Sequence, residues 1–359
     1  PRNIWRYKAL LPVPTDIEQS PNTEPGFTRL LKADNLAAEL GLTNLWVKDD
    51  STNPTNSFKD RVVACALSAA TEFKSKVFAC PSTGNLANAV AAAGARAGIR
   101  TVVFIPSNLE KPKQVNSAIF TDSLVAVNGN YDDVNKLAQE IAGEEDGWAF
   151  VNVNVRPYYA EGSKTLGFEI AEQLGWRIPD QIVIPVASGS QLTKVHKAFG
   201  ELIKLGLVED KPYKIFGAQA TGCSPVSVAY KAGVDAIRPV KPDTIAKSLA
   251  IGNPADGIYV LDICRETGGA VEDITDDEVR EAIVLLARTE GIFTETAGGT
   301  TVGVLKKLVE SGQLDPTLDT VVINTGHGLK TLDAVSDIVA PAATIDPSYA
   351  AFVGTGLGA

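Results

Sequence analysis

The chain has 359 residues, 45% of them hydrophobic, so it can bury a sizeable core, and its length favours two domains over one. A formal net charge of −10 argues against nucleic acids and anionic membranes as partners, and no apolar run is long enough to cross a bilayer. The four scattered cysteines and the lack of a visible signal peptide predict a cytoplasmic protein with reduced thiols.

Residues 1–30 are rich in proline and turn formers, and they predict an arm that lies on the surface or reaches a partner subunit. From residue 33 onward, short β-branched runs alternate with longer amphipathic or alanine-rich runs. Strands are expected at residues 45–47, 77–80, 101–105, 124–127, 181–186 and 320–323, and helices at residues 59–70, 85–97, from about 111, 132–142, 192–205 and 302–309. This alternation predicts an α/β fold with parallel sheets covered on both faces, in which ligands bind beyond the carboxyl ends of strands. The glycine-rich tail, Tyr349 to Ala359, is expected to be loose.

The segment Asn53–Arg61 places a lysine, Lys59, in the first turn of a predicted helix. Capping residues at positions 55–57 precede it, and apolar residues follow at helical spacing from Phe58 onward. The helix dipole puts partial positive charge at this end, which disfavours a cation and favours the free amine that forms a Schiff base. The alternative is a solvated lysine at a helix end, and three further glycine-containing turns favour the reactive interpretation.

The first of these turns, Pro81–Asn85, follows a predicted strand and opens a helix. Its backbone N–H groups, with the hydroxyls of Ser82 and Thr83 beside Gly84, form an anion site that would suit a substrate carboxylate. An ordinary helix cap is the alternative, because serine, threonine and asparagine are favoured there in any case.

The second turn, 187–191, again joins a strand to a helix and contains Ser188, Gly189, Ser190 and Gln191. Small residues let the backbone approach a phosphate, and the hydroxyls add donors. The turn matches neither the P-loop nor the GxGxxG pattern, so it fits a monophosphate better than a dinucleotide. A tight turn with no ligand is an equally good interpretation of this segment by itself.

The third turn, Asn324–Lys330, has two glycines around His327, and Thr325 presents an uncharged hydroxyl at a strand end. His327 is either a general base or, as is more common in a tight turn, a structural residue. A fourth segment, Glu295–Thr301, opens a predicted helix and forms either a wall of the same pocket or only a helix start. No GxSxG motif is present, and two histidines are too few for a histidine metal cluster.

A lysine at a helix start, an oxyanion turn, a monophosphate turn and a neutral hydroxyl are the requirements of an enzyme that uses pyridoxal 5′-phosphate. The lysine forms the Schiff base, one turn holds the phosphate, and another holds the amino-acid carboxylate. The group at the pyridine nitrogen sets how much negative charge the ring absorbs. The sequence therefore predicts this cofactor.

The chain also resembles the threonine synthases, within the fold-type II family of pyridoxal-phosphate enzymes. The similarity covers nearly the whole length and rests on Ile4–Tyr7, Asn53–Arg61, Ser82–Asn85, Ile251–Pro254 and Thr325–Lys330. The resemblance implies two doubly wound parallel-sheet domains with the cofactor between them. A large cofactor-binding domain is expected at residues 1–55 plus 151–359 and a smaller substrate-side domain at residues 56–150, in a chain that forms a homodimer.

The resemblance also implies roles for individual residues. Lys59 carries the cofactor, and Phe58 belongs to the same binding site. Asn85 contacts the ring 3′-oxygen, and Thr325 meets the pyridine nitrogen. Two of the turns hold the anionic groups: Ser188, Gly189, Ser190 and Gln191 the cofactor phosphate, and Ser82, Thr83 and Gly84 the substrate carboxylate.

The region expected to hold a substrate phosphate departs from the family pattern. The family has a serine after the first asparagine and an arginine shortly before a Glu-Gly pair, whereas Val153 and Tyr159 or Ala160 stand in those places here. Arginine, with its paired N–H donors, is the best ligand for a leaving phosphate. The candidates for this role are therefore the cation Arg156, with the amides of Asn152 and Asn154 and with Lys111 or Lys113.

The resemblance implies conversion of O-phospho-L-homoserine and water to L-threonine and phosphate. Lys59 is expected to remove the α- and β-protons in turn, because no other base is well placed in the sequence. The departures near Tyr159 keep a second reaction class open, a β-replacement or dehydratase activity on serine, threonine or phosphoserine, similar to cysteate synthase. A non-catalytic binding protein that retains the fold is the remaining alternative.

Overall fold

The computed structural model describes residues 1–17, 22–82, 84–109, 111–129 and 131–357. Its strands form two sheets. The larger has the order β1-β2-β10-β7-β8-β9 and is parallel except for the antiparallel edge strand β1. The smaller has the order β5-β4-β3-β6 and is parallel throughout. The predicted α/β fold with parallel sheets is therefore confirmed.

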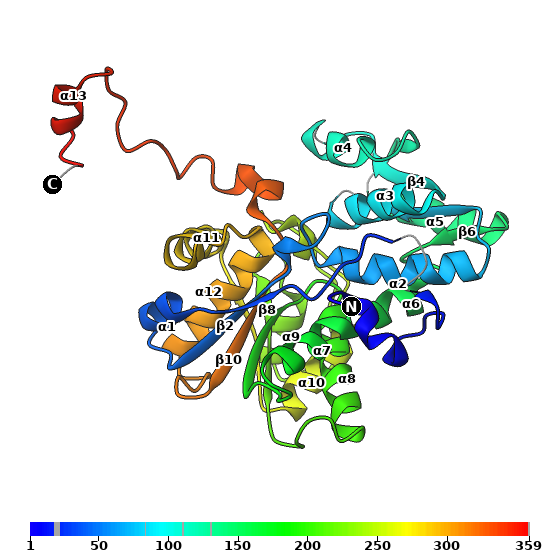
Figure 1. The fold of residues 1–359 in the computed structure, drawn as a ribbon, viewed down its shortest axis with the longest axis horizontal. Helices are drawn as coiled ribbons and strands as arrows, with labels where there is room; N and C mark the ends of the chain where they lie inside the picture. The colour runs from blue at the N-terminus through cyan, green and yellow to red at the C-terminus, as the bar shows by residue number, and fades with distance from the viewer. Residues whose placement is uncertain (18–21, 83, 110, 130, 358–359) are drawn as a thin grey trace.

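The larger sheet is built from strands at both ends of the sequence. Its strands are β1 (Arg29–Lys32), β2 (Asn44–Asp49), β7 (Gln181–Pro185), β8 (Lys214–Ala220), β9 (Val271–Ile274) and β10 (Asp319–Asn324). Its helices are α1 (Asp34–Leu40), α7 (Lys164–Gln173), α8 (Ser190–Lys204), α9 (Pro225–Lys231), α10 (Gly257–Glu266), α11 (Asp276–Glu290) and α12 (Thr296–Glu310), with short 3-10 turns η3 (Asp50–Thr52) and η4 (Lys247–Leu249). Helices α11 and α12 cover one face of this sheet and α7 to α10 cover the other (Figure 1).

Alternation along β7 explains why both faces of the larger sheet are covered. Ile182 and Ile184 pack in the same core as Val195 of α8, whereas Val183 between them packs in the core that contains Val302 of α12. Because successive side chains of a strand point to opposite faces, an uninterrupted apolar strand needs a helix on each side.

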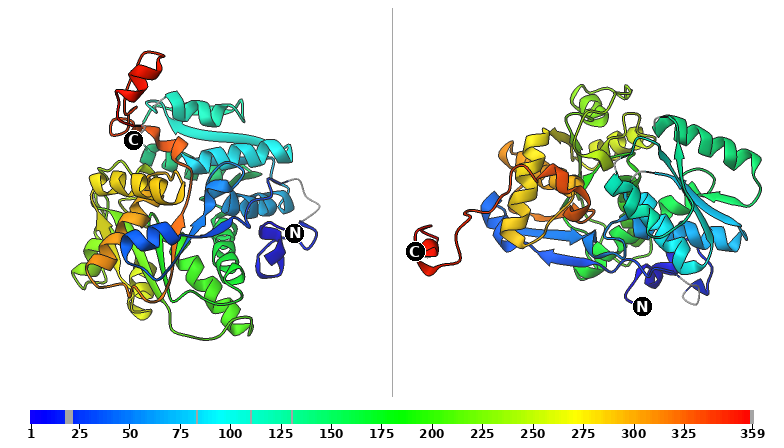
Figure 2. Two further views of the ribbon diagram at one scale, coloured as in Figure 1. Left: turned by 60° about the vertical axis from the view of Figure 1, so that its left-hand side comes forward. Right: turned by 90° about the horizontal axis from the view of Figure 1, so that it is seen from above.

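The strands of the smaller sheet all lie between Val77 and Phe150. Its strands are β3 (Val77–Pro81), β4 (Arg100–Pro106), β5 (Leu124–Val127) and β6 (Trp148–Phe150), with helices α2 (Lys59–Glu72), α3 (Asn85–Ala97), α4 (Lys111–Ala118) and α5 (Tyr131–Glu144). Figure 2 shows this unit beside the larger one. The short helix α6 (Arg156–Gly162) packs against α2 and α8 and so links the two units.

The N-terminal segment is not a surface arm, and that part of the prediction is wrong. A 3-10 helix, η1 (Ile4–Leu10), buries Ile4 and Trp5 against Cys65 of α2. Arg6 and Tyr7 both bond to Glu172 of α7. The apolar side chains among the prolines drive this burial, because leaving an isoleucine and a tryptophan exposed would cost several kcal/mol, about 1.5–3 for each large side chain.

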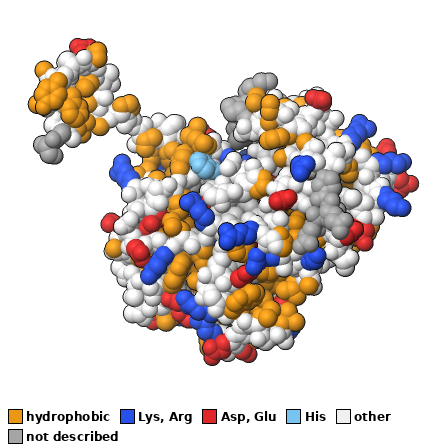
Figure 3. Space-filling model, in the orientation of Figure 1, with side chains coloured by type: hydrophobic (Ala, Val, Ile, Leu, Met, Phe, Trp, Pro, Cys, Tyr) orange, Lys and Arg blue, Asp and Glu red, His pale blue; other side chains and the backbone are white. Residues whose placement is uncertain are grey.

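The C-terminal segment projects from the body after the 3-10 helix η5 (Gly328–Ala334) and ends in a short helix, α13 (Tyr349–Val353). Hydrophobic side chains gather on this projecting segment in the space-filling view (Figure 3). Tyr349 is 82% exposed, so the tail gains little from packing on the chain's own core. Within the described residues, no helix is both long enough and apolar enough to span a membrane.

Most predicted elements lie within a residue or two of the observed ones, and α3 has the predicted bounds. Several elements of the larger unit were not predicted, among them β8, α9, α10, β9 and α11. Among the predicted elements α12 differs most, because it begins at Thr296 rather than at residue 302. The run of small residues 296–301 therefore lies inside the helix and not in a turn before it. These residues are fully buried against neighbouring elements, and tertiary packing of this small-residue face outweighs the weak helix propensity of its glycines and threonines.

Candidate active site

A pocket lies where elements of the two units meet. Its lining comes from the loop before α2, the starts of α2, α3, α8 and α12, helix α6 and the end of β10. The lining includes all eight residues of the predicted cofactor site: Phe58, Lys59, Asn85, Ser188, Gly189, Ser190, Gln191 and Thr325. Ser57, Tyr159, Ser163 and Glu295 also line it. All four of the segments singled out in the sequence therefore contribute to one site, and three of them lie at the carboxyl ends of parallel strands, where ligands are expected.

Lys59 is placed at this site because the loop before α2 pairs with the turn after β10. The Phe58 N–H donates to the Thr325 carbonyl at 2.8 Å, and the His327 N–H donates to the Asn56 carbonyl at 3.1 Å. Asn56 has the left-handed φ of 60° that turns the chain into the helix, a conformation that asparagine tolerates well. The result fixes the first residue of α2 at the end of a central strand. The His327 ring Nδ1 accepts from the Leu329 N–H at 3.2 Å, so this side chain stabilises the turn.

The Lys59 amine has an unusual set of neighbours for a lysine. Its Nζ donates to the Tyr159 hydroxyl at 3.0 Å and lies 5.6 Å from the ring centres of both Phe58 and Tyr159. Among the described residues no carboxylate pairs with it. A phenol and two aromatic faces stabilise a cation far less than a carboxylate does, so the amine is left available for chemistry.

Opposite the lysine, one carboxylate connects two predicted cofactor ligands. Glu295, 2% exposed, accepts from Asn85 Nδ2 at 2.8 Å and from Thr325 Oγ1 at 2.9 Å. Glu295 was not among the predicted ligands, although its segment was considered as a pocket wall. The available signal was a lone carboxylate directly before a run of small residues at a helix start.

The turn before α8 has the form expected of a phosphate site. Gly189 has a φ of 99°, and a side chain there would place its Cβ 3.0 Å from the Asp256 carbonyl oxygen and 2.8 Å from a Val260 methyl. Only glycine meets both conditions without strain. Helix α8 then directs its free N–H groups and the positive end of its dipole toward the pocket.

Two buried polar atoms in the pocket lining await a partner. In the part of the chain that the structure describes, Ser57 Oγ and Gln191 Nε2 make no hydrogen bond although both atoms are buried. An unpaired buried donor costs about 1–3 kcal/mol, so these atoms favour a polar ligand in the pocket. Together with the α8 turn and the free amine, they fit the chemistry of pyridoxal 5′-phosphate.

The predicted carboxylate turn lies next to this pocket. Ser82 is buried at the end of β3, and its hydroxyl oxygen accepts from the Gly84 N–H at 3.4 Å. Thr83 is outside the described residues, as is the side chain of Lys111. Asn85, which starts α3 directly after this turn, is the member that reaches the pocket lining.

The predicted phosphate region differs more from expectation. Both amide atoms of Asn154 bond to the backbone, accepting from the Phe150 N–H and donating to the Trp148 carbonyl, each at 2.8 Å, so this side chain stabilises the end of β6. Arg156 Nη2 donates to Asp256 at 2.9 Å, and its side chain is 45% exposed outside the pocket lining. Asn152 Oδ1 is buried and unpaired among the described residues.

Two further charged groups border the site. Burial raises the pKa of the Asp60 carboxyl to about 6, although it accepts from both the backbone N–H and the hydroxyl of Thr55 at 2.8 Å. Burial likewise lowers the pKa of Lys330, against the attraction of Glu295 and Asp60. No group of histidine, cysteine and carboxylate side chains in the described ranges could hold a metal ion.

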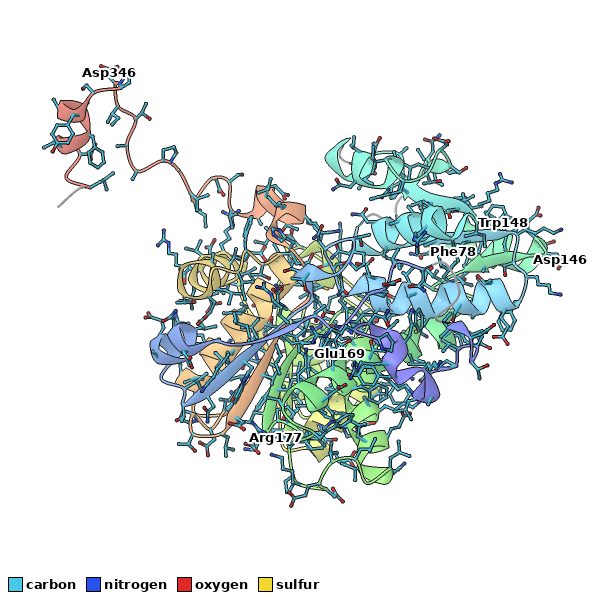
Figure 4. All side chains as sticks on the ribbon, viewed as in Figure 1. Phe78, Asp146, Trp148, Glu169, Arg177 and Asp346 are labelled. Atoms are coloured by element: carbon cyan, nitrogen blue, oxygen red, sulfur yellow. The ribbon has the colours of Figure 1, made fainter. Side chains whose placement is uncertain are left out.

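Beneath the pocket lies a buried ionic network that anchors α2. Arg61 donates to Asp50 at 2.8 Å and to Glu169 at 2.5 Å, and Lys48 donates to the other Glu169 oxygen at 2.8 Å. The side chains of Arg61, Lys48 and Glu169 are fully buried, and Glu169 lies in the interior where the two units meet (Figure 4). Burial alone would raise the pKa of Glu169, but the two cations outweigh it and lower that pKa to about 2.

Comparison with known proteins identifies the family. The profile of a family described as pyridoxal-phosphate dependent enzyme matches residues 22–326. A threonine synthase of Methanosarcina acetivorans is 39% identical, covering 96% of this chain and 84% of the relative. A threonine synthase of Methanocaldococcus jannaschii is 38% identical, covering 92% of this chain and 81% of the relative.

Solved structures of lower identity share the fold. The processed form of threonine deaminase isoform 2 from Solanum lycopersicum superposes with a TM-score of 0.73 at 20% identity, covering 94% of this chain and 92% of that chain. A fungal L-serine ammonia-lyase from Rhizomucor miehei has a TM-score of 0.72 at 21% identity, covering 86% and 96%. With the profile match and the two relatives, these findings show that the chain belongs to the pyridoxal-phosphate-dependent enzyme family and, within it, to the threonine synthases.

Proposed function

We propose that this chain uses pyridoxal 5′-phosphate, bonded to Lys59, to convert O-phospho-L-homoserine and water to L-threonine and phosphate. The observation that carries the proposal is the Lys59 amine, which faces a polar pocket between the two sheets without a carboxylate partner among the described residues. The name shared by the relatives supports the reaction.

The chain's own groups divide the work of holding the cofactor. Ser188, Gly189, Ser190 and Gln191 would hold its phosphate at the start of α8, and Phe58 lines the site beside Lys59. Asn85 and Thr325 would face the ring edge, with Glu295 orienting both. When bound, pyridoxal phosphate supplies an electron sink for the negative charge that develops on the substrate.

The orientation of Thr325 follows from its bond to Glu295. A hydroxyl has one hydrogen to donate, and that of Thr325 is directed to the Glu295 carboxylate. The hydroxyl oxygen is therefore left as an acceptor toward the pocket. The same carboxylate accepts from the side-chain amide nitrogen of Asn85. The side-chain oxygen of Asn85 is therefore not used in this bond.

Lys59 Nζ is the base that we assign to both proton removals, from the α-carbon and then from the β-carbon of the substrate. Substrate binding falls to the groups next to the pocket. Ser82, with Thr83 and Gly84, would hold the carboxylate at the start of α3. Asn152 and Arg156 would bind the substrate phosphate. Arg156 would exchange its ion pair with Asp256 for one with the phosphate. Asn154 is not part of this proposal, because its amide is committed to the backbone.

Three broader proposals accompany this assignment. We assign residues 1–55 and 151–359 to a large cofactor-binding domain and residues 56–150 to a smaller substrate-side domain, supported by the two sheets. The acidic charge and the four buried free cysteines support a cytoplasmic location. The homodimer rests on the family resemblance alone.

The assignment of Lys59 is tested by covalent trapping. Borohydride treatment of the purified, cofactor-loaded protein should fix the cofactor to the peptide that contains Lys59, and mass spectrometry should locate it there. Lys48, which is buried in its ion pairs, is the internal control and should stay unmodified. Protein that takes up no added cofactor would overturn the proposal and restore the non-catalytic interpretation.

The reaction is tested by comparing substrates. Phosphate release should be faster from O-phospho-L-homoserine than from O-phospho-L-serine. One observation favours a second candidate: in the described pocket lining, Lys59 is the only cation, and Tyr159 or Ala160 stands in the place of the family's arginine. Preference for phosphoserine with an added nucleophile would therefore assign a β-replacement activity.

A further inference from the structure

Tyr159 is the direct neighbour of the reacting amine, and its hydroxyl has a free hydrogen. The hydroxyl oxygen accepts from Lys59 Nζ at 3.0 Å, so its own hydrogen points elsewhere. Tyr159 lines the same pocket as Lys59, and among the described residues no acceptor is bound to that hydrogen. The phenol can therefore receive a proton from Lys59 and donate another one into the pocket.

Close packing of two helices sets this geometry. A Cβ on Gly162 would lie 2.8 Å from Val62 Cα and 2.9 Å from the Arg61 carbonyl oxygen, so α6 and α2 are in backbone contact there. Only glycine permits this approach. Tyr159 lies about one turn before Gly162, and Lys59 about one turn before Val62, so the contact brings their side chains together.

The neighbouring tyrosine is placed differently. Tyr158 packs edge-on against Phe73, at the far end of α2, with ring centres 5.4 Å apart. It does not contribute to the described pocket lining. The two adjacent tyrosines thus offer a matched pair, one in the site and one outside it.

The proposed reaction creates a need for a second proton carrier. Lys59 must be a free amine to take the α-proton, and it must be a free amine again to take the β-proton. After the first transfer it is an ammonium ion and cannot act as a base. A phenol and a primary amine hold their protons with similar affinity in water, so exchange between them costs little free energy.

We propose that Tyr159 relays protons from Lys59 to the departing phosphate. After the α-proton is removed, a non-bridging oxygen of the substrate phosphate takes the hydroxyl hydrogen of Tyr159, and the phenolate oxygen takes a proton from the Lys59 ammonium group. Lys59 is then again a free amine. Once Lys59 has taken the β-proton, the protonated phosphate leaves the γ-carbon with the electron pair of the broken bond. This inference rests on the proposed function, because it requires a phosphorylated substrate.

Other ionisable groups in the described lining are less suited to this relay. Besides Lys59 and Tyr159, Glu295 is the ionisable side chain there, and both of its oxygens are bonded to Asn85 and Thr325. Asp60 and Lys330 are near but do not line the pocket. Tyr159 is the group that touches the amine.

The test compares Tyr159→Phe with Tyr158→Phe. Both changes keep the ring and its packing and remove one hydroxyl. We expect Tyr159→Phe to load the cofactor as wild type does, judged by its absorption band and by borohydride trapping. Phosphate release from O-phospho-L-homoserine should slow about 100-fold, the size of a typical acid–base contribution. Tyr158→Phe should match wild type in all three measurements.

A second readout separates a relay from mere positioning of Lys59. In D₂O, exchange of the substrate α-hydrogen, followed by NMR, reports proton removal by Lys59 alone. It should stay within about threefold of wild type in Tyr159→Phe while phosphate release falls.

Three outcomes would overturn the relay: an equal fall in exchange and phosphate release, unchanged release, or a variant that no longer loads cofactor. A wild-type enzyme that exchanges the α-hydrogen but releases no phosphate from this substrate would overturn the proposed reaction, and the relay with it.

Discussion

The start of α2 lies between two polar regions that differ in how far their polar groups are paired. Arg61 faces a dry network in which each charge is paired, with Asp50 and Glu169 as its partners. Lys59, two residues earlier, faces a pocket where, among the described residues, its one polar contact is a phenol and Ser57 Oγ and Gln191 Nε2 are unpaired. Residues two apart on a helix lie about 200° apart around its axis, so one turn of helix can serve both regions.

The difference shows how the fold divides stability from reactivity. In a network where each buried charge has a partner, the side chains are held in one arrangement. Removing any partner is costly, because it leaves a buried charge unpaired. An unsaturated pocket is the opposite, since its free groups gain energy only when a ligand arrives. The network therefore fixes the position of the first turn of α2, and Lys59, the first residue of that turn, faces the pocket.

The largest expected effect is on activity in the pocket. Lys59→Ala removes the cofactor attachment and the base together, so turnover should fall by at least about 1,000-fold. Stability should change by only about 0.5 kcal/mol, because no ion pair is lost among the described residues. Urea unfolding and phosphate release measure the two effects. A variant that loses stability instead of activity would contradict the division between the regions.

The network should respond in the reverse way. Glu169→Gln leaves the buried Lys48 without a carboxylate in the network and Arg61 with Asp50 alone, and it should destabilise the fold by about 3–5 kcal/mol. Glu172→Gln, one turn later on α7, removes a partly exposed pair with Arg6 and should cost about 1 kcal/mol or less. Urea unfolding of the two variants compares them directly, and equal costs would show that burial of the network does not decide its strength.

Acid should weaken the buried network. The pKa of Glu169 is lowered to about 2 in the fold, from an ordinary value of about 4.5. Its stabilising contribution is therefore complete above about pH 4.5 and is lost as the pH falls toward 2, a total of about 3 kcal/mol. Urea unfolding at several pH values should show this loss, and Glu169→Gln should reduce the slope. Asp60 acts in the opposite sense, because its raised pKa makes its contribution disappear as the pH rises through about 6.

Local signals in the sequence were enough to predict α2, α3, α8 and β10, which carry much of the pocket lining. Strand alternation and caps gave α3 its bounds, and the residues of the α8 turn reach the pocket as expected. These features depend on neighbours within a few positions. The parallel order of the strands then brings their carboxyl ends together, whatever the details of packing.

Tyr159 and Glu295 could not be predicted as site residues in the same way. Tyr159 reaches Lys59 because Gly162, 100 positions later in the chain than Val62, allows two helices to touch. Glu295 is positioned by where α12 begins, and that start was misplaced because its small residues read as a turn. The burial of Ile4 and Trp5 likewise depends on a partner surface on α2. The positions of these residues are set by tertiary contacts, which local propensity in the sequence does not reveal.

Substitution of Arg156 tests whether the substrate site extends beyond the described pocket lining, and its expected effect is the smallest of the four. Its ion pair with Asp256 is half exposed, so Arg156→Ala should change stability by about 1 kcal/mol or less. If the guanidinium meets the substrate phosphate, KM for O-phospho-L-homoserine should rise about tenfold, the equivalent of about 1.4 kcal/mol, while cofactor absorption is unchanged. Asp256→Asn is the matched control, because it releases Arg156 without removing it and should leave KM equal to or below that of wild type. An equal rise in both variants would instead mean that the pair acts by supporting the Ser188 turn, to which the Asp256 N–H donates a bond of 2.8 Å.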